Sequence, residues 1–450
     1  MPENKAEQQL ATQSIGRLLA HYAFPAIVAM VAASLYNMAD AAFIGQCVGP
    51  MAISGLAITF PLMNISSAFG AAIGVGASTG ISIKLGQRDY ATANKIFGCS
   101  VSLKIVIGIL LMVFTLPLLD PILRFFGATD ATLPYARDYM VIILIGSIFT
   151  HLYFGLNGIL RAVGKPRQAM QATLFTVIVN IILDPIFIYV FQWGIQGAAW
   201  ATVLSQALAL CWQIKIMNDP DLPVRFQRGI YRMRPDLVGN ILAIGISPFA
   251  MNTCACIVVI FINTTLVYHG GDLAVGAYGI ANRIGFVFFM VVMGINQGMQ
   301  PIAGYNYGAR QLKRVIQVLR LSAFWATIVM TAGWLIGELL PEQCARVFTS
   351  DPELIAKSAH AMRINMLLFP IIGFQAVVTN FFQSIRKALI SILLSLSRQM
   401  LILLPLLVIL PPRFGEDGVW YSLPASDGIA TLITLTTLIV YASRHRHTWA

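Results

Sequence analysis

The sequence predicts an all-α polytopic membrane protein in which twelve transmembrane helices form two pseudo-symmetric halves of six helices each. Only 11% of its 450 residues are charged and 57% are hydrophobic, whereas soluble domains have about 25% charged residues. Many apolar runs exceed the roughly 20 residues that an α-helix needs to cross a bilayer. The second half of the chain also repeats residues of the first half at a constant distance.

Twelve apolar segments are predicted to span the membrane. They cover residues 17–44, 54–83, 96–120, 134–159, 165–191, 194–217, 236–267, 273–301, 314–340, 358–384, 387–411 and 419–443. The polar connection at residues 218–235 contains four arginines and three prolines and lies midway along the chain. The predicted organisation is therefore an N-terminal six-helix lobe at 1–217, a cytoplasmic linker at 218–235 and a C-terminal six-helix lobe at 236–450.

An internal repeat relates the two halves at an offset of 222 residues. Matches that need no gap include Gly76 with Gly298, Gly86 with Gly308, Arg88 with Arg310, and Lys165 with Lys387. Because each half has an even number of spans, both halves should have the same orientation, related by a two-fold axis along the membrane normal with a cavity between them. This arrangement is typical of an alternating-access carrier rather than of a channel.

Basic residues are concentrated on one predicted face of the membrane. Of the 30 lysines and arginines, 23 are assigned to this face: Lys5, Arg17, Lys84, Arg88, Lys95, Lys104, Arg161, Lys165, Arg167, Lys215, Arg225, Arg228, Arg232, Arg234, Arg310, Lys313, Arg314, Arg320, Arg386, Lys387, Arg398, Arg444 and Arg446. Since cytoplasmic loops are enriched in Lys and Arg, both termini and the linker are predicted to be cytoplasmic. No basic stripe with interleaved aromatic residues indicates nucleic-acid binding.

Two isolated aspartates in apolar segments are the main candidates for function, because a carboxylate at membrane depth costs about 2.5–3.5 kcal/mol on insertion scales. The first, Asp40, shares one helix face with Tyr36 and Asn37. Pro25, earlier in the same segment, permits a kink. We expect Asp40 to couple ion and substrate, with Tyr36 and Asn37 as substrate-binding neighbours. The alternative is a packing role.

The second aspartate, Asp184, follows Asn180 by one helical turn and precedes Pro185. Polar residues of other segments that could join it are Asn157, Thr202 and Gln206, for which a purely structural network is an equal alternative. The predicted ion-coupling residues are Asp40, Asn157, Asn180, Asp184 and Thr202, with Gln206 assigned to substrate. Oxygen ligands suit Na⁺, for which Asp40, Asp184 and Asn180 are candidates, whereas a desolvated aspartate suits H⁺. The sequence leaves the choice open.

The second half has no acid in its seventh and tenth segments, so it is expected to supply the wall of a substrate cavity. The candidate substrate-binding residues there are Asn252, Met290, Met293, Gln297 and Gln300. The amides of Asn252 and Gln297 are expected to be buried, and methionine adapts to varied apolar ligands.

A third membrane acid, Asp427, is expected to have a packing or capping role. Arg283 and Arg398 are its candidate ion partners.

No catalytic or cofactor-binding pattern is recognised in the sequence. Nothing matches a Walker A loop, a catalytic triad or a zinc motif, and the six cysteines have no framework spacing. We therefore predict that the protein is not an enzyme, needs no cofactor, and uses an H⁺ or Na⁺ gradient as its energy source.

These features resemble the multidrug and toxic compound extrusion (MATE) family over about residues 15–443. The resemblance rests on Asn37-Met-Ala-Asp40, on Asn180 with Asp184-Pro185, and on Gln300-Pro-Ile-Ala-Gly-Tyr-Asn-Tyr-Gly308, which is similar to the bacterial MepA-type branch. It implies Na⁺- or H⁺-driven export of cationic, amphiphilic drugs and dyes through a first-half site that Asp40, Asn157, Asn180, Asp184 and Thr202 match. Some members have a further acidic site in the second half, which the seventh and tenth segments of this chain lack.

The predicted function is secondary active export of cationic amphiphilic compounds across a bacterial inner membrane in exchange for H⁺ or Na⁺. The expected form is a multi-pass monomer that requires no ATPase subunit. The alternative is a flippase for lipid-linked or other amphipathic substrates. That alternative should place several basic residues in the cavity, for which only Arg283 is a candidate.

Overall fold

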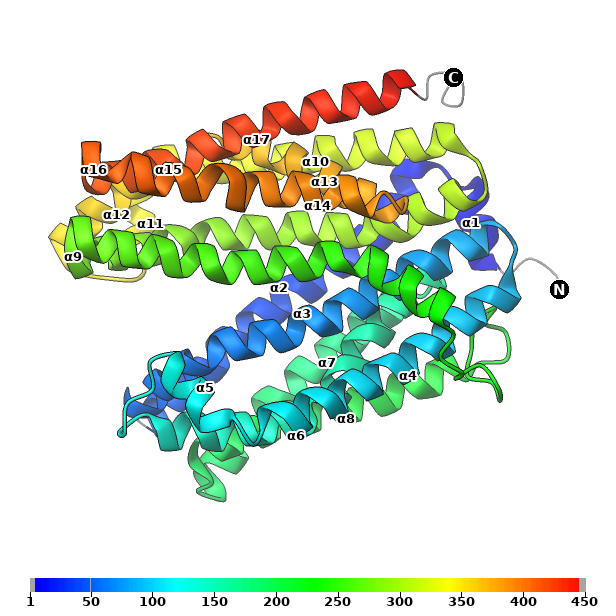
Figure 1. The fold of residues 1–450 in the computed structure, drawn as a ribbon, viewed down its shortest axis with the longest axis horizontal. Helices are drawn as coiled ribbons and strands as arrows, with labels where there is room; N and C mark the ends of the chain where they lie inside the picture. The colour runs from blue at the N-terminus through cyan, green and yellow to red at the C-terminus, as the bar shows by residue number, and fades with distance from the viewer. Residues whose placement is uncertain (1–4, 49, 445–450) are drawn as a thin grey trace. The chain divides into compact units, whose positions relative to one another are not determined.

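The computed structural model describes residues 5–48 and 50–444, which are almost entirely helical and contain no strand (Figure 1). The first half comprises α1 (Lys5–Thr12), α2 (Ile15–Cys47), α3 (Pro50–Gly86), α4 (Tyr90–Thr115), α5 (Leu119–Phe125), α6 (Leu133–Ala162), α7 (Pro166–Pro185), η1 (Ile186–Val190) and α8 (Gly194–Met217). The second half comprises α9 (Pro235–Gly308), α10 (Leu312–Leu339), α11 (Pro341–Arg346), α12 (Pro352–Asn365), α13 (Phe369–Ser384), α14 (Ala388–Leu396), η2 (Ser397–Leu403), α15 (Leu404–Ile409), α16 (Pro411–Phe414) and α17 (Glu416–Arg444).

Ten helical segments among the described residues are long and apolar enough to cross a membrane, and α12 with α13, bent by 54°, adds an eleventh. The remaining predicted span corresponds to α8, which has 24 residues. The long helix α9 contains two of the spans, because Gly271 interrupts it with φ 70° and ψ −170°, a conformation open to glycine. The twelve-span, all-α layout is confirmed.

Equivalent elements begin and end at equivalent positions in the two halves, which supports the internal repeat. Helices α3 and α9 end at Gly86 and Gly308, which are related by the offset of the repeat, and α4 and α10 begin the same distance apart. Arg88 and Arg310, between these elements, both adopt φ 58°. The repeat therefore extends to an uncommon left-handed backbone conformation. Each half also has one π-helical segment, η1 or η2.

Contacts divide the chain into two compact units that differ from the predicted lobes. Unit 1 contains the described residues of Met1–Gln13 and Val28–Phe249, and unit 2 contains Ser14–Ile27 and the described residues of Ala250–Ala450. The start of α2 thus belongs with the second half, and the start of α9 with the first.

Glycines permit the close helix packing that produces this exchange of segments. Within unit 2, a Cβ on Gly298 of α9 would lie 2.6 Å from the Cα of Ala23 in α2. Within unit 1, a Cβ on Gly76 of α3 would overlap the carbonyl oxygen of Ile241 in α9. Helix backbones approach this closely only where one side chain is absent.

Lys104 and Arg398, which were counted on the cytoplasmic face, lie well inside apolar membrane-spanning segments. Lys104 is in the middle of α4 and is 1% exposed. Arg398 lies in η2 and pairs with Asp427. Sequence counting fails here because it treats every lysine and arginine near a span as a loop residue. The prediction of cytoplasmic termini, which remains a prediction, rests on the other residues of that set.

Candidate functional site

Asn180 and Asp184 lie one turn apart near the C-terminal end of α7. This helix begins with Pro166, at a position where a missing N–H is tolerated, and ends at Pro185. The π-helical segment η1 follows at once. The change from α-helix to π-helix fits Pro185, which has no N–H to donate to the carbonyl four residues earlier. Both polar side chains are fully buried, with 0% exposure.

The Asn180 side chain connects Asp184 to α8. In the amide orientation that satisfies both of its ends, the nitrogen donates to Asp184 Oδ2 at 3.0 Å and the oxygen accepts from the Thr202 backbone N–H at 3.2 Å. The hydrogen bonds assign this orientation. The structure thus brings together three of the predicted residues, and their role in ion coupling stays a prediction.

Gln206 extends this polar cluster to α6. It lies one turn after Thr202 on α8, and both side chains are buried. Its Oε1 accepts a hydrogen bond from the Thr150 hydroxyl at 2.5 Å. Thr150 was not among the predicted site residues, because nothing in its own sequence context indicates a partner on α8.

Asn157 has a different environment, in the contact between α6 and α7. Its Nδ2 donates to the Ala169 carbonyl at 2.9 Å and to the Thr173 hydroxyl at 3.0 Å. Its Oδ1 accepts from the Arg161 guanidinium. These contacts favour the structural alternative for Asn157, since they hold α6 against α7.

The other predicted residues of the first half lie on α2. Tyr36 is half-buried. Asn37 and Asp40 are helical, but their side chains lie outside the part that the structure describes. The predicted partnership of Asp40 with the Asp184 cluster therefore remains a prediction.

The candidate substrate-binding residues of α9 are not all buried as expected. Met290, Met293, Gln297 and Gln300 are half-buried and, at spacings of three and four, share one helix face. Asn252 is exposed. The expectation of a buried amide is thus wrong for Asn252.

Asp427 forms an ion pair within unit 2. Its Oδ1 accepts from Arg398 Nε at 2.6 Å, and the aspartate is 4% exposed. The expected packing role fits this contact between α17 and η2. Arg283, the other candidate partner, is exposed on α9.

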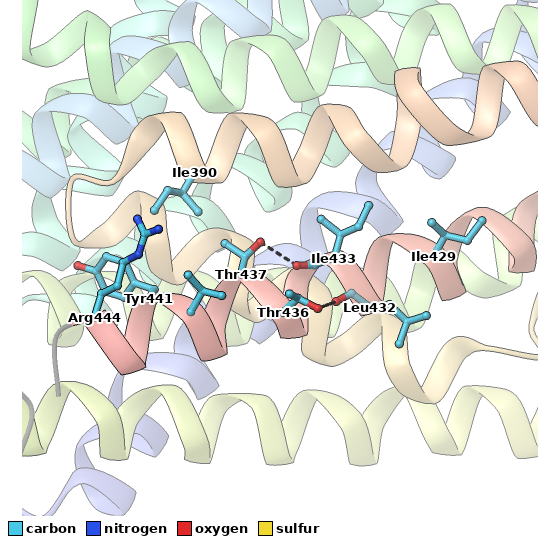
Figure 2. Close-up of a pocket in the computed structure, with 9 residues that line it drawn as sticks. Ile390, Ile429, Leu432, Ile433, Thr436, Thr437, Tyr441 and Arg444 are labelled. Atoms are coloured by element: carbon cyan, nitrogen blue, oxygen red, sulfur yellow. Dashed lines mark hydrogen bonds between the residues drawn. The ribbon is translucent and has the colours of Figure 1, made fainter.

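A shallow apolar pocket of about 570 Å³ lies along α17 in unit 2. Figure 2 shows Ile390 opposite a row of α17 side chains, with Tyr441 and Arg444 at one end and Ile429 at the other. None of the predicted site residues lines it.

Sequence profiles decide the family. The MatE profile matches residues 25–186 and again residues 248–409, which together exceed half of the chain. The chain belongs to the MatE family. The two matched ranges correspond to the two halves of the internal repeat, so one profile describes both halves of this chain.

Individual relatives of the MatE chain include the multidrug export protein MepA of two staphylococci. The Staphylococcus haemolyticus protein is 28% identical over 442 residues, covering 97% of this chain and 95% of its own. The Staphylococcus aureus NCTC 8325 protein is 29% identical over 436 residues, covering 96% and 95%.

Solved MATE structures share the fold. The MATE multidrug transporter DinF-BH superposes with a TM-score of 0.90 at 35% identity, covering 99% of both chains. An outward-facing multidrug resistance MATE transporter of the MOP superfamily superposes with a TM-score of 0.93 at 23% identity, covering 99% of this chain and 100% of its own. This MatE chain is thus a multi-pass membrane protein.

Proposed function

We propose that this MatE-family protein is a secondary active exporter that moves cationic, amphiphilic compounds out of the cell in exchange for H⁺ or Na⁺. The observation that carries the proposal is the buried carboxylate of Asp184, which accepts from the neutral amide of Asn180 inside unit 1. The names of the relatives support the substrate class, since MepA is called a multidrug export protein and DinF-BH a multidrug transporter.

Competition for a carboxylate is the basis of the proposed exchange. An ionised Asp184, together with Asp40, attracts an organic cation from the cytoplasmic side. Binding of H⁺ or Na⁺ to the same oxygens from outside removes that attraction and releases the compound. Because a one-for-one exchange of a monovalent ion for an organic monocation moves no net charge, the concentration gradient of the ion drives it, and a tenfold ion gradient, about 1.4 kcal/mol, sustains a roughly tenfold concentration ratio of exported compound.

Alternating access supplies the conformational part of the proposal. The halves of the repeat open a cavity first to the cytoplasm and then to the exterior, in a membrane where both termini are cytoplasmic. No cofactor or catalytic step is required. The flippase alternative gains no support from the names of the relatives.

The test uses purified protein in vesicles, with a fluorescent cationic rhodamine dye and an imposed gradient of either H⁺ or Na⁺. Wild type should accumulate the dye against its own concentration gradient when one of the two ion gradients is imposed. The gradient that drives this transport identifies the coupling ion. Asp184→Asn should abolish gradient-driven transport, because asparagine keeps the shape and removes the charge. The matched control is Asp138→Asn, at an exposed acid of α6. Dye transport by Asp184→Asn at the wild-type rate would refute the proposal.

A further inference from the structure

Two basic side chains, Lys104 of α4 and His151 of α6, are buried inside unit 1. They are 1% and 2% exposed, and both lie within membrane-spanning helices. A charged lysine in such a place is expensive and is usually paired or functional. Neither residue belongs to the Asp184 cluster described above.

Glycines make room for both side chains. Gly155 follows His151 by one turn of α6, and a Cβ there would overlap Lys104 Nζ. On α3, a Cβ on Gly70 would lie 2.9 Å from His151 Cδ2. The amine therefore rests against the backbone of α6 at Gly155, one turn after the position of His151.

The contacts of His151 determine which of its ring nitrogens carries hydrogen. Nε2 lies 3.1 Å from the carbonyl oxygen of Ser66 and 3.2 Å from its hydroxyl. A carbonyl only accepts, so Nε2 carries the hydrogen, and in the neutral ring Nδ1 keeps its lone pair. Within the described residues, neither His151 Nδ1 nor Lys104 Nζ has a hydrogen-bond partner.

The described surroundings show no negative charge paired with either of the two bases. In the part of the chain that is described, no carboxylate is hydrogen-bonded to either side chain. On α3, no residue between Ser66 and Lys84 is titratable. Two positive charges would repel strongly in this apolar interior, so the pair accommodates one added proton rather than two.

Other titratable groups on the packed helices face elsewhere. On α4, Lys95 is exposed and Cys99 contacts the Arg234 backbone. On α6, Arg161 contacts Asn157, and Tyr153 contacts the threonines of α7. Among the described residues, none of these groups is hydrogen-bonded to Lys104 or His151.

We propose that Lys104 and His151 form a shared proton-binding site in unit 1. The site holds one proton in either of two forms, the Lys104 ammonium with a neutral imidazole or a neutral amine with the His151 imidazolium. Since Nζ and Nδ1 are not hydrogen-bonded to each other, each base binds and releases the proton separately. The total charge of the pair is one in both forms.

Helix α6 carries residues of both this site and the polar cluster around Asp184. Thr150, next to His151, donates to Gln206, which lies one turn from Thr202. A proton-binding role during transport rests on the proposed function in its H⁺-coupled form. The existence of the site does not.

The test is a double-mutant cycle on proton uptake by the purified full-length protein in detergent, titrated between about pH 10 and about pH 5, a range that spans ordinary lysine and histidine values. The variants are Lys104→Met, His151→Gln and the double variant, with Lys95→Met as the exposed control. If one proton is shared, each single variant keeps the wild-type uptake, because the remaining base still binds it. The double variant then takes up about one proton fewer per molecule. An unchanged double variant, or single losses that add to the double loss, would overturn the proposal.

A second measurement needs only the wild-type fold. Nitrogen-15 spectra of His151, assigned by comparison with the spectrum of His151→Gln or, if that variant does not fold, of His151→Asn, should show hydrogen on Nε2 alone at alkaline pH. Nδ1 should gain hydrogen on acidification. Hydrogen on Nδ1 at alkaline pH, or no change over the titration, would contradict the shared site. If the site titrates as expected while dye transport responds only to Na⁺, the shared site stands and the H⁺-coupled form of the proposed function is wrong.

Discussion

At the scale of single residues, Asn157 and Asp184 show how similar sequence signals lead to different roles. Both are buried polar groups on neighbouring helices. Asn157 uses its amide to hold Ala169 and Thr173, and its oxygen to hold Arg161. Asp184 is an acid, so it alone can change charge when a cation binds.

Replacing Asn157 with alanine should lower stability without changing the coupling ion. The variant leaves the Arg161 guanidinium and the Ala169 carbonyl without this partner, which costs about 1–3 kcal/mol. The melting temperature in detergent should fall, while the response of dye transport to H⁺ and Na⁺ gradients keeps its wild-type form. Unchanged melting together with an altered ion dependence would assign Asn157 to ion coupling instead.

Residue spacing predicted part of this site but not all of it. The four-residue interval placed Asn180 beside Asp184, because that interval is one turn of a single helix. Contacts between helices, such as Thr150 with Gln206 or Lys104 against Gly155, depend on tertiary packing. No local pattern reports such contacts.

At the scale of helices, the repeat allows a comparison of two equivalent helix starts. Asp89 caps α4 and accepts from the Thr92 backbone N–H at 3.1 Å, and Lys84 Nζ lies 3.1 Å from its Oδ2. The equivalent cap of α10 is Gln311, whose side chain makes no such bond. Partial burial acts to raise the pKa of Asp89, but the hydrogen bonds from Thr92 and the charge of Lys84 lower it below its ordinary value.

Asp89→Ala should destabilise the protein by about 1 kcal/mol through loss of the cap, whereas Gln311→Ala should have little effect. Since the folded-state pKa of Asp89 is lowered, its contribution is present above the unfolded-state pKa and is lost as pH falls through the folded-state value. The melting temperatures of Asp89→Ala and Gln311→Ala should therefore converge in acid. Equal melting of the two alanine variants at neutral pH would show that the cap contributes nothing.

Helix positions were predicted well, because apolar length and turn residues are local signals. The predicted segments 165–191 and 387–411 contain α7 with η1 and α14 with η2, each begun by a lysine cap at Lys165 or Lys387. The π-helical segments themselves were not predicted, since a single proline or serine does not distinguish a π turn from an α turn.

At the scale of the whole molecule, the halves of the repeat and the compact units are different divisions of the chain. The repeat follows sequence, while the units place Ser14–Ile27 with unit 2 and the residues up to Phe249 with unit 1. Sequence could not predict this exchange, because it depends on the close approach of Gly76 and Gly298 to partners that are distant in the chain.

The predicted orientation can be tested with single cysteines. Gly229 and Gly415 have positive φ values of 87° and 61°, so cysteine there would be strained. The better positions are the exposed neighbours Gln227 and Arg413. In a background whose native cysteines are replaced by alanine, Gln227→Cys should be protected from an impermeant thiol reagent in intact cells, and Arg413→Cys should react. The reverse pattern would place the linker outside.

The central claim, exchange of a cation for an organic cation, is tested most directly by running the exchange backwards. Vesicles without an ion gradient are loaded with a pH-sensitive or a Na⁺-sensitive fluorophore, and a gradient of the cationic rhodamine dye is then imposed. The account predicts that dye movement drives H⁺ or Na⁺ in the opposite direction in wild type and in Asp138→Asn, and that Asp184→Asn abolishes this ion flux. Dye movement in wild type with no opposing flux of either ion would contradict the account.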